Sequence, residues 1–259
     1  MATASLAEIA EHLDTLLRTA DVPDYPGALN GIQVENGAPI TRVAVAVDAS
    51  LRTIQGAIDV GANLLIVHHG LFWSGAQPLR GRVYERFRRL LAHDIAVYSS
   101  HLPLDLHPTL GNNALLARAL GLDPVEGFAR FQSISVGVMG NADADTESLA
   151  ARAGAIAAAE GGTLVSIGVT PGRRTRRWAI CTGAGASSDT LREAAAAGVD
   201  TLIVGEGPHH TGIDAAELGI AVLYAGHYAT ETFGVRALGA ELEHRFELPW
   251  DFIAAPTGL

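Results

Sequence analysis

The sequence contains no lysine and only one cysteine, and these two shortages already exclude several classes of protein. All 18 basic residues are arginine, and they stand against 28 acidic residues, which gives a formal net charge of −10. This balance argues against nucleic-acid binding, because such binding depends on many basic groups that face phosphates. The single cysteine, Cys181, excludes a disulfide framework and a metal cluster of thiolates. Without lysine there is also no phosphate-binding loop of the type GxxxxGKS or GxxxxGKT.

Long hydrophobic runs are missing as well, although 48% of the residues are hydrophobic. No run approaches the ~18 residues that a membrane-spanning helix needs, and the alanine-rich stretch 146–160 is interrupted by Arg152. The segment 1–18 is acidic, and Ser5 and Glu8 have the spacing of a capping box, which predicts a helix of the fold instead of a secretory signal. We therefore expect a cytoplasmic protein with no membrane segment.

What the chain does contain is an internal repeat. GANLLIVHHG at 61–70 aligns with GVDTLIVGEG at 198–207 without a gap, and each ends an apolar run with two polar residues and a glycine. This alignment pairs His69 with Glu206. Each half of the chain is predicted to alternate strands with helices.

A second pair of segments extends the repeat. DIAVYSSHLPLD in the first half matches GIAVLYAGHYATE in the second half with one insertion. The match pairs His101 with His227, and Asp105 with Glu231. These residues follow strand-like runs, so we expect them at the carboxyl ends of strands, where ligands bind in open α/β sheets.

Strands that alternate with helices and are almost wholly apolar predict an α/β fold. We expect a duplicated α/β unit whose mostly parallel sheets are covered by helices. Between the halves, residues 125–175 have the pattern of a small β-α-β insert that carries no cluster of ligand-type residues. The predicted domains are a first α/β half (1–124), which together with the second half (176–259) forms the main metal-binding domain, and a small inserted subdomain (125–175).

His68 and His69 end one of the apolar runs, and Gly70 follows them. Neighbouring side chains of a continuing strand point to opposite faces, but a turn at Gly70 lets both imidazoles face one cavity. The alternative is that one histidine packs in the core and hydrogen-bonds a carbonyl group. The pair alone does not decide between these two interpretations.

The two histidine–carboxylate pairs have different surroundings. Pro103 lies between His101 and Asp105 and disfavours a regular helix, so a loop is predicted there. In the second half a helix is predicted, and His227 and Glu231, four residues apart near its first turn, can face the same point. Either pair alone also occurs by chance.

Five candidate metal ligands result: His68, His69, Asp105, His227 and Glu231. Imidazole nitrogens with carboxylate oxygens, and no thiolate, form a ligand set for Zn, Fe, Mn or Co. Five ligands are too many for one tetrahedral site with an open position, and they suit two divalent ions bridged by a carboxylate. Two such ions bring more positive charge than two carboxylates neutralise, which favours an anionic small molecule as substrate.

Several motifs resemble the Nif-three-like dinuclear metal-centre family, a YbgI-like group often labelled GTP cyclohydrolase I type 2 homologue. They are LLIVHHGLFW, SSHLPLDLHPTLGNN, GEGPHHT and GHYATETFG, with LNGIQVENG and VAVDAS near the N-terminus. The resemblance covers both halves and leaves mainly 125–175 unsupported. It implies that the same five residues bind the metals, with Glu231 as the bridge, and that the chain assembles into a homohexamer.

Two functions follow as hypotheses. The first is a metal-dependent hydrolase, in which two ions activate a water while His101 or Glu206 moves protons. The family label implies a GTP-like, nucleotide substrate for such an enzyme. The second is a non-catalytic metal-binding or partner-binding protein, in which the metal centre is structural or regulatory.

Two arginine clusters, at 80–89 and 172–178, do not by themselves favour either hypothesis. Runs of charge usually form a solvated face. The alternative is a local basic surface. In the absence of lysine, a phosphate group of a substrate would be met by arginine or by the residual positive charge of the metals.

Overall fold

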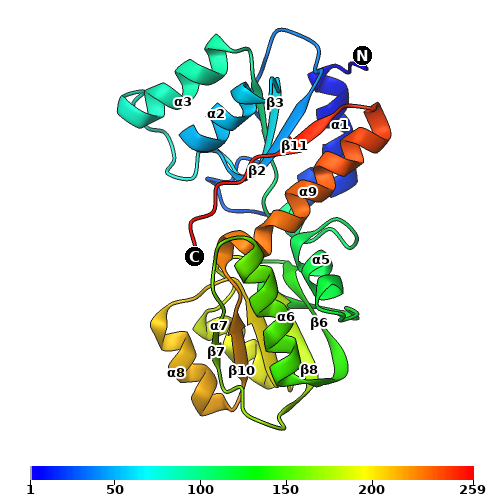
Figure 1. Ribbon diagram of the computed structural model, residues 1–259, viewed down its shortest axis with the longest axis vertical. Coiled ribbons are helices and arrows are strands. Elements are labelled where there is room, and N and C mark those ends of the chain that lie inside the picture. The colour runs from blue at the N-terminus through cyan, green and yellow to red at the C-terminus, as the bar shows by residue number, and fades with distance from the viewer. Residues whose placement is uncertain (1) are drawn as a thin grey trace. The chain divides into compact units, whose positions relative to one another are not determined.

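The computed structural model describes residues 2–259 (Figure 1). Contacts between Cα atoms group the chain into two compact units. Unit 1 comprises the chain up to Leu104 together with Gly234–Ala255, and unit 2 comprises Asp105–Phe233 together with Pro256–Leu259. Each unit is built around a sheet of its own.

Unit 1 contains a five-stranded sheet. In spatial order its strands are β1 (Gly31–Val34), β4 (Ala96–Ser99), β3 (Leu64–His69), β2 (Val43–Asp48) and β11 (Trp250–Phe252). Strands β4, β3, β2 and β11 run parallel, and β1 pairs antiparallel with β4 at one edge. Leu64, Leu65 and Ile66 of β3 are fully buried, as expected for a parallel strand whose two faces are both covered.

Unit 1 contains the following helices that belong to it alone. They are α1 (Leu6–Leu17), α2 (Leu51–Asp59), α3 (Gly81–Ala92) and the short 3-10 helix η1 (Thr19–Asp21). The capping box at α1 is confirmed, because the Glu8 amide donates to the Ser5 hydroxyl and the Ser5 amide donates to the Glu8 carboxylate. Ile54 of α2 and Leu90 of α3 pack in the same core cluster as Leu65 of β3.

Unit 2 contains a six-stranded sheet. In spatial order its strands are β5 (Glu126–Phe131), β6 (Ile134–Asp145), β8 (Arg174–Cys181), β9 (Thr201–Val204), β10 (Ala221–Tyr224) and β7 (Val165–Ile167). Strands β8, β9 and β10 run parallel, whereas the outer strands pair antiparallel.

Helices cover both faces of the unit 2 sheet. They are α5 (Asn112–Ala119), α6 (Thr146–Ala159), α7 (Ser188–Ala196) and α8 (His209–Leu218). Successive side chains of β8 point to opposite faces and so separate two cores. Trp178 and Ile180 pack with residues of α5 and α6, whereas Ala179 and Cys181 pack with residues of α7 and α8.

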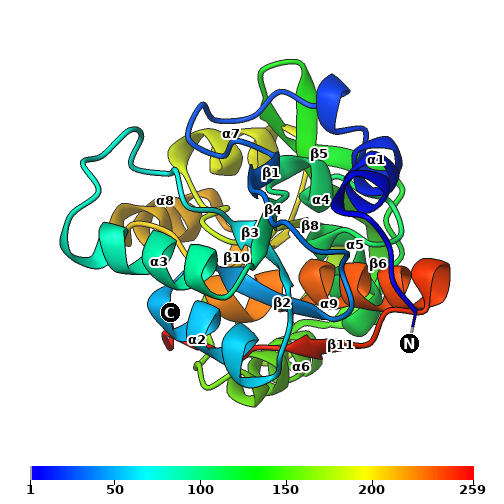
Figure 2. The same cartoon turned by 90° about the horizontal axis from the view of Figure 1, so that it is seen from above.

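Two helices carry residues of both units. The short helix α4 (Leu102–Asp105) contributes only its last residue to unit 2. The long helix α9 (His227–Phe246), orange in Figures 1 and 2, begins with residues of unit 2 and continues with residues of unit 1.

The two sheets confirm the predicted α/β fold. The parallel set β2-α2-β3-α3-β4 of unit 1 recurs in unit 2 as β8-α7-β9-α8-β10, which is the arrangement that the sequence repeat predicts. Within residues 2–259, no helix combines the length and the apolarity that crossing a bilayer requires.

Two local features differ from the expectation. The segment 125–175 supplies β5, β6, α6 and β7 to unit 2, because β6 pairs with β8 and β7 pairs with β10. Backbone hydrogen bonds thus join it to the strands of the second half in one sheet. The predicted loop after His101 is wrong, since Leu102–Asp105 is helical. The first turn of a helix needs no amide donor, so Pro103 is tolerated there.

Candidate metal centre

In unit 1, three histidines meet at the carboxyl ends of neighbouring strands. His68 and His69 end β3, and His101 lies just beyond β4. One nitrogen atom from each of the three rings lies within 4.8 Å of the others. His68 is fully buried, whereas the other two histidines are partly exposed.

Gly70 makes the turn that follows the histidine pair. The amide of Leu71 donates a hydrogen bond of 2.7 Å to Oε1 of Gln33. A Cβ atom at position 70 would meet the side-chain amide of Gln33, which would have to move and give up this hydrogen bond. The ring centroids of His68 and His69 are 4.7 Å apart, and the two neighbouring imidazoles therefore lie together.

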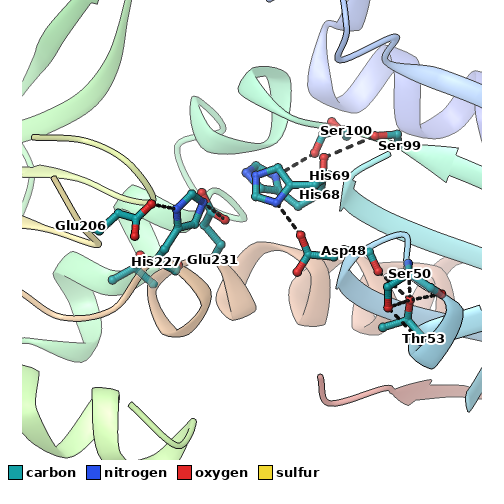
Figure 3. Close-up of polar contacts among 11 residues, drawn as sticks. Asp48, Ser50, Thr53, His68, His69, Ser99, Ser100, Glu206, His227 and Glu231 are labelled. Atoms are coloured by element: carbon teal, nitrogen blue, oxygen red, sulfur yellow. Dashed lines mark hydrogen bonds and ion pairs between the residues drawn. The ribbon is translucent and has the colours of Figure 1, made fainter. Parts of the chain in front are cut away.

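Oxygen atoms hold the Nδ1 atom of both rings. Nδ1 of His68 lies 3.0 Å from the carbonyl oxygen of Ser100, and Nδ1 of His69 lies 3.0 Å from Oδ1 of Asp48 (Figure 3). Metal-ligating histidines usually donate their second ring N–H to an oxygen in this way, which fixes the tautomer and the ring orientation. Nε2 is then the atom that each ring presents as a ligand.

His101 is held by a buried carboxylate. Its Nδ1 lies 2.8 Å from Oδ1 of Asp24, whose Oδ2 accepts hydrogen bonds from the amide of Leu102 and from the side chain of Asn30. Burial alone would raise the pKa of Asp24, but the hydrogen bond and the charge of His101 outweigh it and lower that pKa below the usual carboxyl range. The pair has the form of a histidine–carboxylate dyad that can move a proton.

In unit 2, His227 and Glu231 occupy the first two turns of α9. Nε2 of His227 lies 3.1 Å from Oε2 of Glu231, and its Nδ1 lies 2.8 Å from Oε1 of Glu206 (Figure 3). Glu231 is only 3% exposed. Burial alone would lower the pKa of His227, but hydrogen bonds to the two carboxylates and their charges raise it to about 9.

Gly183 leaves the space that this pair occupies. Its φ of +62° lies in the left-handed region that favours glycine. A Cβ atom at Gly183 would collide with Oε1 of Glu231 and would lie 3.3 Å from Nε2 of His227. The backbone at position 183 can therefore lie next to both candidate ligands because glycine has no side chain.

Asp105 is the remaining candidate ligand of unit 2. It is 8% exposed, and its Oδ1 accepts hydrogen bonds from the side chains of Asn112 at 2.8 Å and Thr182 at 3.4 Å. Thr182 directly precedes Gly183, so Asp105 lies beside the same backbone segment that contacts Glu231. Two carboxylates buried in this way are typical of a site that holds cations.

Each unit thus gathers part of the predicted ligand set. Unit 1 places His68 and His69 next to His101, and unit 2 places Asp105 near the pair formed by His227 and Glu231. The donor atoms are imidazole nitrogens and carboxylate oxygens, which fit Zn, Fe, Mn or Co.

A family model described as Duf34/NIF3 (NGG1p interacting factor 3) matches residues 4–257, which is nearly the whole sequence. The chain belongs to the Duf34/NIF3 family. This finding confirms the resemblance that the sequence motifs indicate.

Several proteins similar to this chain align with it over almost their full length. The GTP cyclohydrolase 1 type 2 homolog of Deinococcus radiodurans is 41% identical over 261 residues, which cover 97% of this chain and 94% of that protein. The Escherichia coli protein of the same name is 37% identical and covers 96% of this chain and 98% of its own length. The solved structure of the protein ybgI, of unknown function, has a TM-score of 0.88 at 36% identity and covers 98% of this chain and 100% of that chain. A crystal structure from Thermus thermophilus has a TM-score of 0.81 at 35% identity, with the same coverage.

Sequence reasoning missed several groups that position these ligands. Asp24 is 77 residues away from His101 along the chain and stands in a loop without a periodic pattern. Ser100 contributes its backbone carbonyl oxygen, which any residue type would supply, so the sequence could not indicate this contact. Asn112 could have been identified from the sequence, because it lies inside SSHLPLDLHPTLGNN, one of the motifs that resemble the family.

The Asp48→Asn variant is expected to bind divalent metal about 10- to 100-fold more weakly, because an amide no longer holds the Nδ1 proton of His69 as a carboxylate does. Competition with a chromogenic chelator measures the change. Asp189→Asn is the matched control, since Asp189 is exposed and pairs with Arg192 on the surface of α7. Equal metal affinity in both variants would contradict the role given to Asp48.

Cys181 is expected to resist thiol reagents in the folded protein. Burial, followed by the charges of Asp105 and Glu231, raises the pKa of its thiol to about 12. The thiolate is the reactive form, so labelling at pH 8 should be at least about 1,000-fold slower than in the unfolded chain. A thiol-exchange assay with and without denaturant measures both rates. Fast labelling of the folded protein would contradict this burial.

Proposed function

We propose that the protein is a metal-dependent hydrolase that holds two divalent cations and acts on a nucleotide-like or other anionic small molecule. The proposed ligands are His68, His69, Asp105, His227 and Glu231.

The observation that carries the proposal is the common environment of four histidines. His68, His69, His101 and His227 each have Nδ1 within 3.0 Å of an oxygen atom, and in three of them that oxygen belongs to a carboxylate. A single histidine that only packs in a core can have an oxygen atom beside Nδ1 by chance. Four histidines with Nδ1 fixed in this way, of which His68, His69 and His227 would present Nε2 as a ligand atom, are typical of a metal centre with supporting carboxylates.

Two bound divalent cations would supply the chemistry of lowering the pKa of a water and polarising the electrophilic carbon or phosphorus of the substrate. The chain itself provides two proton-handling pairs. His101 with Asp24 can take a proton at Nε2 while the carboxylate stabilises the resulting imidazolium. Glu206 fixes the ring of His227 through Oε1 and lies at a solvent-accessible position from which a proton can leave.

Unit 2 also offers space for a small molecule beside Glu206. A cavity of about 460 Å³ is lined by Glu206, His209 and Tyr224, together with several glycines. Its polar side chains can orient a ligand, as a small number of polar groups do in most small-molecule sites. The name carried by the relatives supports a nucleotide-like substrate, and we propose a homohexamer as the assembly because the family resemblance implies it.

Metal analysis followed by a turnover screen tests this function. The purified protein should contain about two divalent ions per chain. Nucleotides, cyclic amides and phosphoesters are then assayed before chelation, after chelation and after reconstitution. Hydrolysis that disappears and returns with the metal supports the enzyme. Metal without turnover across the panel would contradict it and would favour a structural or regulatory centre.

A further inference from the structure

The loop that follows His69 and Gly70 encloses a second, smaller cavity within unit 1. It has a volume of about 220 Å³ and lies between this loop and the first turns of α3. Its lining includes Leu71, Phe72, Leu79, Arg82, Arg86 and Phe87. A mostly apolar wall therefore surrounds two arginines.

The two arginines lie on one face of α3. Arg82 and Arg86 are four residues apart, so their side chains are neighbours on the helix, and like charges at this spacing destabilise it. Within residues 2–259, neither side chain takes part in a hydrogen bond or an ion pair, and Nε of Arg86 is buried without a partner. Arg88 of the same helix, in contrast, pairs with Glu85 at 2.9 Å.

The guanidinium of Arg86 is partly buried. Burial, together with the charge of Arg82, lowers the pKa of Arg86, while the charge of Asp48 acts in the opposite direction. An arginine remains protonated despite such a shift, so the cavity holds two positive charges next to Phe72 and Phe87. Cationic donors in apolar surroundings are unfavourable until an anion meets them.

The cavity is also connected to the candidate metal centre through residues of unit 1. Asp48, the carboxylate that acts on Arg86, is the one that holds Nδ1 of His69. The cavity wall begins at Leu71, two residues beyond His69. The cavity therefore adjoins the segment that follows the carboxyl end of β3.

We infer that Arg82 and Arg86 form a binding site for the phosphate or diphosphate group of a small-molecule substrate. Guanidinium groups present forked donors that match phosphate oxygens, and two of them neutralise a dianion. The inference deepens the proposed function and rests on it, because it assigns the substrate's anionic end to the cavity and leaves its reacting end for the candidate metal ligands.

Calorimetric titration with inorganic pyrophosphate tests the site. The full-length chain is stripped of metal with a chelator, so that the probe cannot bind through cations. We expect wild-type protein to bind pyrophosphate, and the double variant Arg82→Gln/Arg86→Gln to bind it at least tenfold more weakly. Arg88→Gln is the matched control, because it removes one charge from the same helix but does not line the cavity, and it should bind as the wild type does.

Affinity of the double variant within twofold of the wild type, or no binding to wild type at millimolar pyrophosphate, would overturn the inference. Thermal melts of the three proteins establish that each is folded. The metal content of the untreated variants separates the two proposals. Arginine-dependent pyrophosphate binding in a protein that never holds metal removes the hydrolase and keeps the anion site, whereas normal metal content with arginine-independent binding removes only the anion site.

Discussion

Replacing Glu231 by glutamine is expected to lower bound metal from about two ions per chain to less than one, and to abolish metal-dependent turnover. Glutamine has the same shape, so packing is preserved, but the charge and one strong ligand oxygen are lost. The carboxylate is 3% exposed and adjoins His227, and a neutral amide there cannot compensate cationic charge. Removal of a supporting group costs about 10- to 100-fold in metal affinity, and removal of a ligand should cost more.

Equilibrium dialysis followed by elemental analysis measures the metal content. Glu217→Gln is the matched control, because Glu217 is an exposed residue of α8 and its loss removes the same charge. The control should keep the wild-type metal content. If Glu231→Gln also keeps it, Glu231 is not a ligand, and the role assigned to this end of α9 is wrong.

The Trp178→Ala variant is expected to have a free energy of unfolding about 3–5 kcal/mol lower than the wild type. Trp178 in β8 is fully buried and packs in one core cluster with Leu116 of α5 and Leu149 of α6. On the neighbouring strand, Gly140 approaches so closely that a Cβ there would lie 2.7 Å from the indole ring. Truncation therefore leaves a cavity that rigid strands on both sides cannot close.

Chemical denaturation followed by far-ultraviolet circular dichroism measures this loss without relying on tryptophan fluorescence. Leu218→Ala is the control, because Leu218 at the end of α8 is 45% exposed and should change stability by no more than about 0.5 kcal/mol. A loss below about 1 kcal/mol for Trp178→Ala would contradict the tight packing of the sheet against α5 and α6.

Much of the fold and of the candidate site could be predicted from the internal repeat. Gapless alignment of 61–70 with 198–207 predicted two equivalent parallel strands, and these are β3 and β9. It also placed His69 and Glu206 at the ends of those strands. Such residues are predictable because a strand buried on both faces has an unmistakable apolar run, and its polar end stands out against it.

What the sequence did not predict depends on contacts that are distant along the chain. The pairing of β6 with β8 joins residues such as Val138 and Ile180, and the sequence of neither strand indicates with which other strand it pairs. The Asp24–His101 bond has the same origin. Pro103 shows a different failure, because a rule for helix interiors was applied to a four-residue helix in which the proline occupies the first turn.

Anomalous diffraction from crystals grown with Zn²⁺ or Mn²⁺ locates bound ions without assuming an activity. We expect two peaks per chain, with Nε2 atoms of His68, His69 and His227 and carboxylate oxygens of Asp105 and Glu231 at about 2.0–2.2 Å from them. Peaks at other residues, or no peak near these five side chains at saturating metal, would contradict this expectation.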